Sequence, residues 1–257
     1  MQSLPERASR VPEPHDEPPR TEDGPVEPAR VRLEGRRFGS YGSLLLHRAV
    51  RDFVHGFRTL RRVGPCVTVL GSARFPEGHP YYTMAREVGR GLGRLGFTVM
   101  TGGGPGVMEA ANRGARDVGA GSVGCNIELP EEQQPNPYLD HLVTCHYFFV
   151  RKVLLFRHSF AFVALPGGFG TMDELFEALT LIQTKRTVQY PVVLMGTMYW
   201  RALLRQLAQM VNADTIEPDE LELLLVSDDL DEALAHIRRH AIERFGLRVR
   251  PKSRSAR

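Results

Sequence analysis

A glycine-rich segment, Leu165–Glu174, separates two stretches of different periodicity in this chain of 257 residues. Before it, residues 160–165 form a continuous apolar run, which is typical of a strand buried on both faces of a parallel sheet. After it, the sequence predicts a helix that begins at or near Thr171, because apolar residues recur at helical spacing. The glycines therefore lie at a strand-to-helix turn, where backbone N–H groups and the helix dipole favour an anion.

A second glycine turn of the same type occurs earlier in the chain, at residues 102–106, after the apolar run 97–100. The later turn has an alternative interpretation as a capping box, in which Thr171 and Glu174 satisfy backbone N–H groups of the first helical turn. Two turns of one kind favour a different interpretation, in which a single ligand is held from two sides.

The chain alternates between short apolar runs and helical patterns. This alternation predicts parallel βαβ units with right-handed crossovers, and hence an α/β fold with a Rossmann-like, doubly wound parallel sheet. Ligands of such sheets bind at the carboxyl ends of the strands, where both glycine turns and the small-residue turn Gly71-Ser72 lie. Strands are expected at residues 66–70, 97–101, 122–127, 141–146, 160–165, 190–195 and 224–227, and helices at 43–62, 81–95, 106–118, 148–157, 171–184, 198–211 and 230–245.

Composition predicts a single domain with two tails. Residues 1–38 hold seven of the eighteen prolines and few large apolar side chains, which predicts a disordered extension. Residues 39–246 are expected to form the Rossmann-like nucleotide-monophosphate-binding domain, and residues 247–257 a basic tail. No run of eighteen apolar residues could span a bilayer, so we expect no membrane contact.

The cysteines and the net charge indicate in which compartment the protein works and which partners it binds. The three cysteines, Cys66, Cys125 and Cys145, are widely spaced and form no CxxC pair, so we expect reduced core residues of a cytoplasmic protein. A net charge of +3 is too small to argue for a nucleic-acid partner. No cluster has the spacing of metal ligands, and neither a Walker loop nor a GxSxG serine turn is present.

One basic pair lies in an unusually apolar helical pattern. Arg151 and Lys152 are flanked by Tyr147–Val150 and Val153–Phe156. A pair on a solvated helix face is the usual alternative, but so apolar a helix leaves little room for full exposure. We therefore expect Arg151 to have a fixed partner, either a carboxylate or a ligand phosphate.

The two glycine motifs, GGPGVM at 103–108 and PGGFGTMDE at 166–174, resemble the paired signature of the LOG (LONELY GUY) family of cytokinin riboside 5′-monophosphate phosphoribohydrolases. Members of this family are often mislabelled as lysine decarboxylases. The resemblance covers about residues 64–200. Many members have M-H-E-R-K where this chain has FFVRK at 148–152, which with the long N-terminal extension resembles the longer bacterial branch.

The resemblance implies hydrolysis of the N-glycosidic bond of a purine nucleoside 5′-monophosphate, either a cytokinin nucleotide or AMP, to free base and ribose 5-phosphate. It implies Glu174 and Arg151 as catalytic residues, no cofactor, and a homodimer or higher homo-oligomer. An ionised carboxylate near the anomeric carbon would stabilise an oxocarbenium-like sugar or activate water, and the start of the helix should favour that ionised form. The residues expected to bind substrate and phosphate are Gly71, Ser72, Gly103, Gly104, Gly106, Met108, Lys152, Gly167, Gly168, Gly170 and Thr171.

Two other functions compete with this one. Lysine decarboxylation would need a Schiff-base lysine for pyridoxal phosphate, and Lys152 is the only lysine in the motif region, with no recognisable partner for the pyridine ring. The remaining alternative is a non-catalytic carrier of a nucleotide or a phosphorylated cofactor on the same fold.

Overall fold

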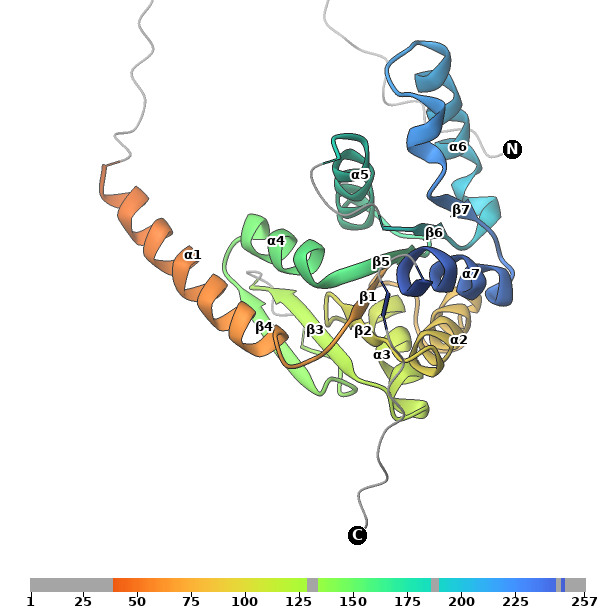
Figure 1. Ribbon diagram of the computed structural model, residues 1–257. Coiled ribbons are helices and arrows are strands. Elements are labelled where there is room, and N and C mark those ends of the chain that lie inside the picture. The colour runs from red at the N-terminus through yellow and green to blue at the C-terminus, as the bar shows by residue number, and fades with distance from the viewer. Residues whose placement is uncertain (1–38, 129–133, 186–189, 244–245, 248–257) are drawn as a thin grey trace, which may run out of the picture. The chain divides into compact units, whose positions relative to one another are not determined.

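The computed structural model describes residues 39–128, 134–185, 190–243 and 246–247 (Figure 1). The predicted disordered extension and all but the first residue of the predicted basic tail lie outside these ranges, so the division of the chain into domain and tails stays a prediction. Within the described ranges, no helix is long and apolar enough to cross a membrane.

Seven strands form one parallel sheet in the order β4-β3-β2-β1-β5-β6-β7. The chain first builds outward from β1 to β4 and then returns to place β5 on the other side of β1. The topological switch point, where such sheets bind ligands, therefore lies between β1 and β5. The strands are β1 (Cys66–Leu70), β2 (Thr98–Thr101), β3 (Ser122–Ile127), β4 (His141–Cys145), β5 (Ser159–Ala164), β6 (Val192–Leu194) and β7 (Leu224–Val226).

Helices cover both faces of the sheet, which confirms the predicted doubly wound α/β fold (Figure 1). Side chains of α2, α3 and α7 pack with one face, and side chains of α1, α4, α5 and α6 pack with the other. The helices are α1 (Gly39–Leu60), α2 (Pro80–Arg94), α3 (Val107–Asp117), α4 (Phe148–His158), α5 (Phe169–Gln183), α6 (Thr197–Asn212) and α7 (Leu230–Ile237), with a 3₁₀ turn at Pro218–Leu221 and a π-helical segment at Arg238–Glu243.

Strand β1 illustrates why the central strands are apolar throughout. All five of its residues are buried, and successive side chains point to opposite faces. Val67 and Val69 pack with α2 and α3, whereas Cys66 and Leu70 pack on the other face. The three cysteines are buried and free, as expected of core residues.

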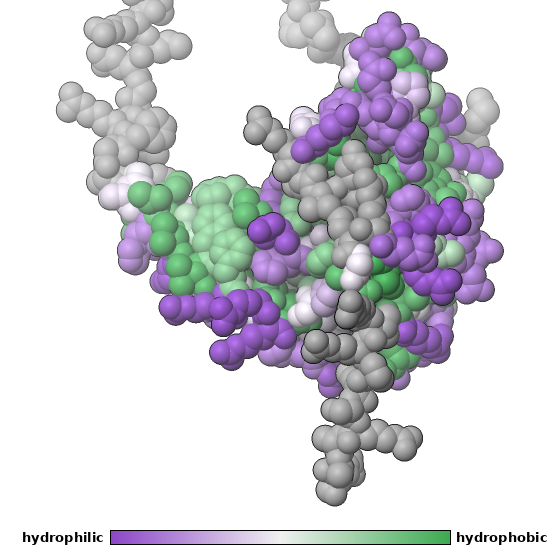
Figure 2. Space-filling view, viewed as in Figure 1, coloured by the Kyte–Doolittle hydropathy of each residue, from purple (hydrophilic) through white to green (hydrophobic). Residues whose placement is uncertain are grey.

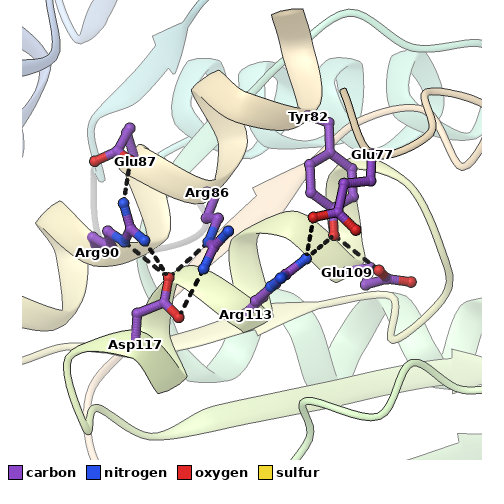
Figure 3. Close-up of polar contacts among 8 residues, drawn as sticks. All are labelled: Glu77, Tyr82, Arg86, Glu87, Arg90, Glu109, Arg113 and Asp117. Carbon is purple, nitrogen blue, oxygen red and sulfur yellow. Dashed lines mark hydrogen bonds and ion pairs between the residues drawn. The ribbon is translucent and has the colours of Figure 1, made fainter. Parts of the chain in front are cut away.

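Helices α2 and α3 pack closely because each contributes a glycine to the contact. A β-carbon at Gly89 would lie 2.1 Å from the carbonyl oxygen of Ala111, and one at Gly114 would lie 2.0 Å from that of Arg86. At the rim of this contact, Asp117 of α3 accepts from Arg86 at 2.7 Å and from Arg90 of α2 at 2.8 Å (Figure 3). These contacts fix α3 on the sheet, and with it the end that follows the first glycine turn.

The helix after the second glycine turn begins earlier than predicted. Helix α5 starts at Phe169, and Gly168 is its N-cap with no side-chain hydrogen bond. Thr171 is therefore the third residue of the helix and Glu174 the sixth, in the second turn. The capping-box alternative is wrong, because its threonine is not the N-cap residue.

Candidate functional site

A cavity of about 500 Å³ opens at the carboxyl ends of the strands. Its walls come from the turns after β1, β2 and β5, from the end of β3, and from α3, α4 and α5, so it spans the switch point between β1 and β5. It is lined by Val69, Leu70, Gly71, Ser72, Ala73, Arg74, Gly102, Gly104, Met108, Asn126, Ile127, Arg151, Gly168, Phe169, Gly170, Thr171 and Glu174.

The second glycine turn presents an open helix end to this cavity. The N–H groups of Thr171 and Met172 both donate to the carbonyl oxygen of Gly168, at 3.0 and 3.1 Å. Among the described residues, no acceptor meets the N–H groups of Phe169 and Gly170, which are the first two of α5. Free N–H groups at the positive end of a helix, here one of 15 residues, are typical of anion sites.

Two glycines of this turn face empty space. A β-carbon at Gly168 or Gly170 would have no neighbouring heavy atom within 4 Å. Neither residue has a positive φ, so the backbone does not require glycine at either position. Both line the cavity, and their lack of side chains leaves room for a ligand to approach the backbone.

The first glycine turn is held from below by buried polar side chains. The N–H of Gly103 donates to the hydroxyl of Thr101 at 2.9 Å, and its carbonyl accepts from the N–H of Asn136 at 2.9 Å. The side-chain amide of Asn136 donates to the carbonyl of Gly104 at 3.0 Å and to the oxygen of Asn112 at 3.1 Å. Gly103 is therefore buried and its N–H is not free for a phosphate, contrary to the prediction.

Three other glycines allow the turns to interlock. Gly71 lies against Val107, and a β-carbon at Gly71 would come within 2.4 Å of that side chain. Gly106 has a φ of 69° and lies against the carbonyl of Ser72. Gly167 lies against the hydroxyl of Thr171. Of these three, only Gly71 lines the cavity, and Gly106 and Gly167 pack against other parts of the chain.

The turn after β1 connects the two glycine turns. The N–H of Ser72 donates to the carbonyl of Pro166 at 3.0 Å, and the carbonyl of Ser72 accepts from the N–H of Val107 at 3.0 Å. The hydroxyl of Ser72 accepts from the N–H of Arg74 at 3.1 Å. The two motifs that are 60 residues apart in sequence thus meet across one serine.

A buried ion pair joins α4 to α5 within the cavity wall. The Nη2 of Arg151 donates to Oε1 of Glu174, and Glu174 is only 5% exposed. This is the fixed carboxylate partner that the apolar helix around Arg151 predicts. The Nε of Arg151 is also buried and has no hydrogen-bond partner among the described residues.

Burial controls the acidity of Glu174. Loss of water raises the pKa of this carboxyl above its usual range, and the charge of Arg151 opposes the rise. The sequence predicts that the helix dipole favours the ionised form of Glu174. In the structure Glu174 lies in the second turn of α5, beyond the first turn where that effect is strongest. A carboxylate with a raised pKa is a better proton acceptor, which suits a group that activates water.

Lys152 does not line the cavity. Its ammonium pairs with Asp173 at 2.8 Å and with Glu177 at 2.6 Å, and it is not among the cavity residues. The prediction that Lys152 binds substrate therefore does not match this arrangement. The lysine links α4 to α5 on the outer side of the helix pair whose inner side carries Arg151 and Glu174.

Eight cavity residues were not among the predicted site residues: Val69, Leu70, Ala73, Arg74, Gly102, Asn126, Ile127 and Phe169. Arg74 is an exposed cation beside Ser72, and Phe169 is 96% exposed at the start of α5. Asn126 had a usable signal, since it is an amide in a mostly apolar strand just before the carboxyl end. Such a residue lies at the edge where parallel sheets bind ligands.

Comparison with known proteins gives the family of the chain. A sequence profile of the family described as "Possible lysine decarboxylase" matches residues 108–237. The chain is 32% identical over 178 residues to a cytokinin riboside 5′-monophosphate phosphoribohydrolase of Rhodococcoides fascians, covering 67% of this chain and 88% of that protein. It is 31% identical to a protein of the same name in Mycobacterium tuberculosis, covering 59% of this chain and 82% of that protein.

Solved structures share the fold. A molybdenum cofactor carrier protein of Chlamydomonas reinhardtii superposes with a TM-score of 0.52 at 26% identity, covering 68% of this chain and 97% of that one. With the fold, the paired glycine motifs and these relatives in agreement, the chain belongs to the LOG family.

Proposed function

We propose that this protein hydrolyses the N-glycosidic bond of a purine nucleoside 5′-monophosphate, releasing free base and ribose 5-phosphate. One observation carries the proposal: a buried Arg151–Glu174 pair lines the same cavity as an open helix end with free N–H groups. The helix end suits a phosphate and the carboxylate suits the sugar, so one ligand that contains both groups can occupy the cavity.

The phosphate supplies binding energy away from the reacting bond. At the start of α5, the N–H groups of Phe169 and Gly170 would donate to its oxygens, with the hydroxyls of Ser72 and Thr171 nearby. Fixing the phosphate places the ribose against Glu174 and lowers the entropic part of the barrier. A nucleoside without the phosphate should then be a poor substrate.

Glu174 acts at the anomeric carbon. Cleavage of the bond builds positive charge on the sugar, which an ionised carboxylate stabilises, and a water molecule must lose a proton as it attacks. Arg151 holds this carboxylate through its Nη2 and favours the ionised form that both roles need. The names of the relatives suggest a cytokinin nucleotide as the substrate, and AMP is the second candidate.

Lysine decarboxylation does not fit the cavity. Pyridoxal phosphate requires a lysine amine for its Schiff base, and none of the residues that line the described cavity is a lysine. Lys152 is paired with two carboxylates on the outer side of α5, and Lys185 lies beyond the end of that helix.

A carrier function is the second candidate. The likeness to the molybdenum cofactor carrier protein favours it, because the name of that protein describes a carrier and not an enzyme. A carrier would use the open helix end for a phosphate but would not need an acid at the sugar. The two functions therefore differ in what Glu174 does.

Product analysis tests the proposal. The purified protein is incubated with AMP and with N6-isopentenyl-AMP, and free base and ribose 5-phosphate are measured by chromatography. We expect both products, and Glu174→Gln should lower turnover by about 10²–10⁴-fold, the usual contribution of a positioned acid or base. Glu177→Gln is the matched control, because Glu177 lies one helical turn later and pairs with Lys152 outside the cavity.

Binding separates the two candidates when no product forms. The Glu174→Gln variant should still bind AMP and ribose 5-phosphate, because it retains the helix end. If wild-type protein releases no base from any purine monophosphate but binds one tightly, the carrier function replaces the hydrolase.

We also propose that the protein is a homodimer. Apolar side chains that are exposed on one chain gather over α1 and α4 (Figure 2), among them Leu46, Val50, Val54, Phe148 and Phe149. Contiguous apolar surface of this kind marks a protein interface. Sedimentation of the full chain at micromolar concentration should give twice the mass of one chain, and Val50→Glu should shift it towards a monomer.

A further inference from the structure

Asn126 is a polar residue in the wall of the cavity that the proposed reaction does not use. It is the penultimate residue of β3, between the buried residues Cys125 and Ile127. Its own side chain is only partly buried and lines the cavity. A core strand therefore carries one amide, and the amide is at the end of the strand that meets a ligand.

The backbone fixes which end of this amide faces the ligand. The N–H of Ile127 donates to Oδ1 of Asn126 at 2.8 Å, and a donor can only be met by the oxygen of the amide. The nitrogen Nδ2 is therefore the end of the amide that is turned away from the N–H of Ile127. Among the described residues, no acceptor meets the two hydrogens of Nδ2, so Asn126 has two donors for a ligand.

The sheet order places Asn126 far from the phosphate site. Strand β3 is three positions from β5, which leads into the open end of α5. Neighbouring strands lie roughly 4.8 Å apart, which puts the two strand ends about 14 Å from one another. A phosphate at α5 therefore cannot reach Asn126. The group that reaches it is the opposite end of the ligand, beyond the ribose.

We propose that Asn126 is a specificity-determining residue that donates a hydrogen bond to an acceptor atom of the nucleobase, a ring nitrogen in the case of a purine. The inference rests on the proposed function, since it takes a nucleoside monophosphate as the ligand and its phosphate at α5. A fixed amide donor favours bases that present an acceptor at this edge and disfavours those that present an N–H there.

Equilibrium binding tests this role without turnover. In the Glu174→Gln background, affinities for AMP and for ribose 5-phosphate are measured by calorimetry, with and without Asn126→Leu. The leucine removes both donors without adding a charge. The loss of one hydrogen bond should weaken AMP binding by about fivefold to tenfold. Ribose 5-phosphate has no base, so its affinity should stay within twofold.

Two further variants keep the result interpretable. Asn126→Asp retains an oxygen for the N–H of Ile127 but replaces the donors with an acceptor, so it should weaken AMP binding at least as much. Asn212→Leu is the matched control, because Asn212 is exposed at the end of α6 and should leave both affinities unchanged. Unchanged ribose 5-phosphate binding in each variant also reports that the cavity is still folded.

Deaza analogues of AMP, each lacking one ring nitrogen, identify the acceptor. The analogue that lacks it should bind the Asn126 protein as weakly as AMP binds Asn126→Leu, and should show no further loss in that variant. Equal losses for AMP and ribose 5-phosphate would overturn the inference, because Asn126 would then contact the sugar or the phosphate. Unchanged AMP affinity would also overturn it. Failure of the Asn126 protein to bind either ligand would instead refute the proposed function itself.

Discussion

The two glycine turns look alike in sequence and differ in structure. The turn after β2 is packed from below, where Thr101 and Asn136 bond to the N–H and carbonyl of Gly103 and to the carbonyl of Gly104, and Asn112 bonds to both of these side chains. The turn after β5 leaves the N–H groups of Phe169 and Gly170 free and opens them to the cavity.

The difference teaches that a glycine run has two physical uses. In the first turn, glycine is needed because other parts of the chain come too close for a side chain. In the second, the exposed glycines have no neighbour at all within 4 Å of a β-carbon, so what needs the space is outside the chain. One turn is a support for the cavity, and the other is its anion-binding surface in the proposed function.

The largest effect should come from Gly106→Ala in the first turn. Gly106 has φ 69° and ψ −129°, a region that side-chain-bearing residues avoid, and a β-carbon would lie 2.5 Å from the carbonyl oxygen of Ser72. Strain and overpacking together should lower the free energy of unfolding by about 2–5 kcal/mol. Urea denaturation followed by circular dichroism measures it.

Gly42→Ala in α1 is the control for this substitution. A β-carbon there would meet nothing within 4 Å, and its φ is not positive, so the free energy of unfolding should not fall. If Gly106→Ala were as stable as this control, the first turn would not be the rigid support that its contacts indicate.

Gly170→Ala should show the opposite behaviour. Alanine in the first turn of α5 fits without strain and should stabilise the protein by about 0.4–1 kcal/mol. Its methyl group would occupy the space beside the free N–H groups, and we expect about a tenfold loss of affinity for ribose 5-phosphate, or about 1.4 kcal/mol. Calorimetric binding together with urea denaturation detects both changes. A loss of stability, or unchanged binding, would remove the contrast between the two turns.

The fold could be predicted because its cause is local. Buried parallel strands are continuous apolar runs, and the glycines that end them mark the ligand edge, so each predicted strand and helix has a counterpart in the structure. Most bounds shift by a few residues, but the last predicted helix, 230–245, is α-helical only over Leu230–Ile237 and continues as the π-helical segment Arg238–Glu243. The partner of Arg151 was also predictable, since an arginine in so apolar a helix must be neutralised. Glu174, 23 positions later, provides that partner.

The sequence could not predict which glycines pack against the chain and which face the cavity, because this depends on contacts between residues distant in sequence. The amide that holds Gly104 comes from Asn136, 32 residues away. Likewise, nothing local shows that Arg151 faces the cavity while its neighbour Lys152 faces the carboxylates outside. That choice follows from how α4 packs on α5, which the helical pattern alone leaves open.

Helix α5, which follows the second glycine turn, should also carry a carboxyl group with a raised pKa. Burial raises the pKa of Glu174, so its carboxyl should lose its proton at a higher pH than an ordinary glutamate. If the ionised form is needed, activity falls as the pH drops through this raised pKa. The carbon NMR spectrum of glutamate-labelled, ligand-free protein should contain one carboxyl resonance that titrates at a higher pH than the other glutamates. This resonance should be missing in Glu174→Gln. A titration in the usual range would contradict a desolvated carboxylate.

The smallest expected effect concerns the outer support of the second turn. Tyr199, partly exposed on α6, donates its hydroxyl to the carbonyl of Gly167 at 2.5 Å. Tyr199→Phe removes this one hydrogen bond, worth about 0.5–1.5 kcal/mol. Because the turn stays anchored by Ser72 through Pro166, ribose 5-phosphate affinity should fall by only about twofold to threefold. A loss as large as that of Gly170→Ala would mean that the second turn, like the first, depends on side chains packed against it.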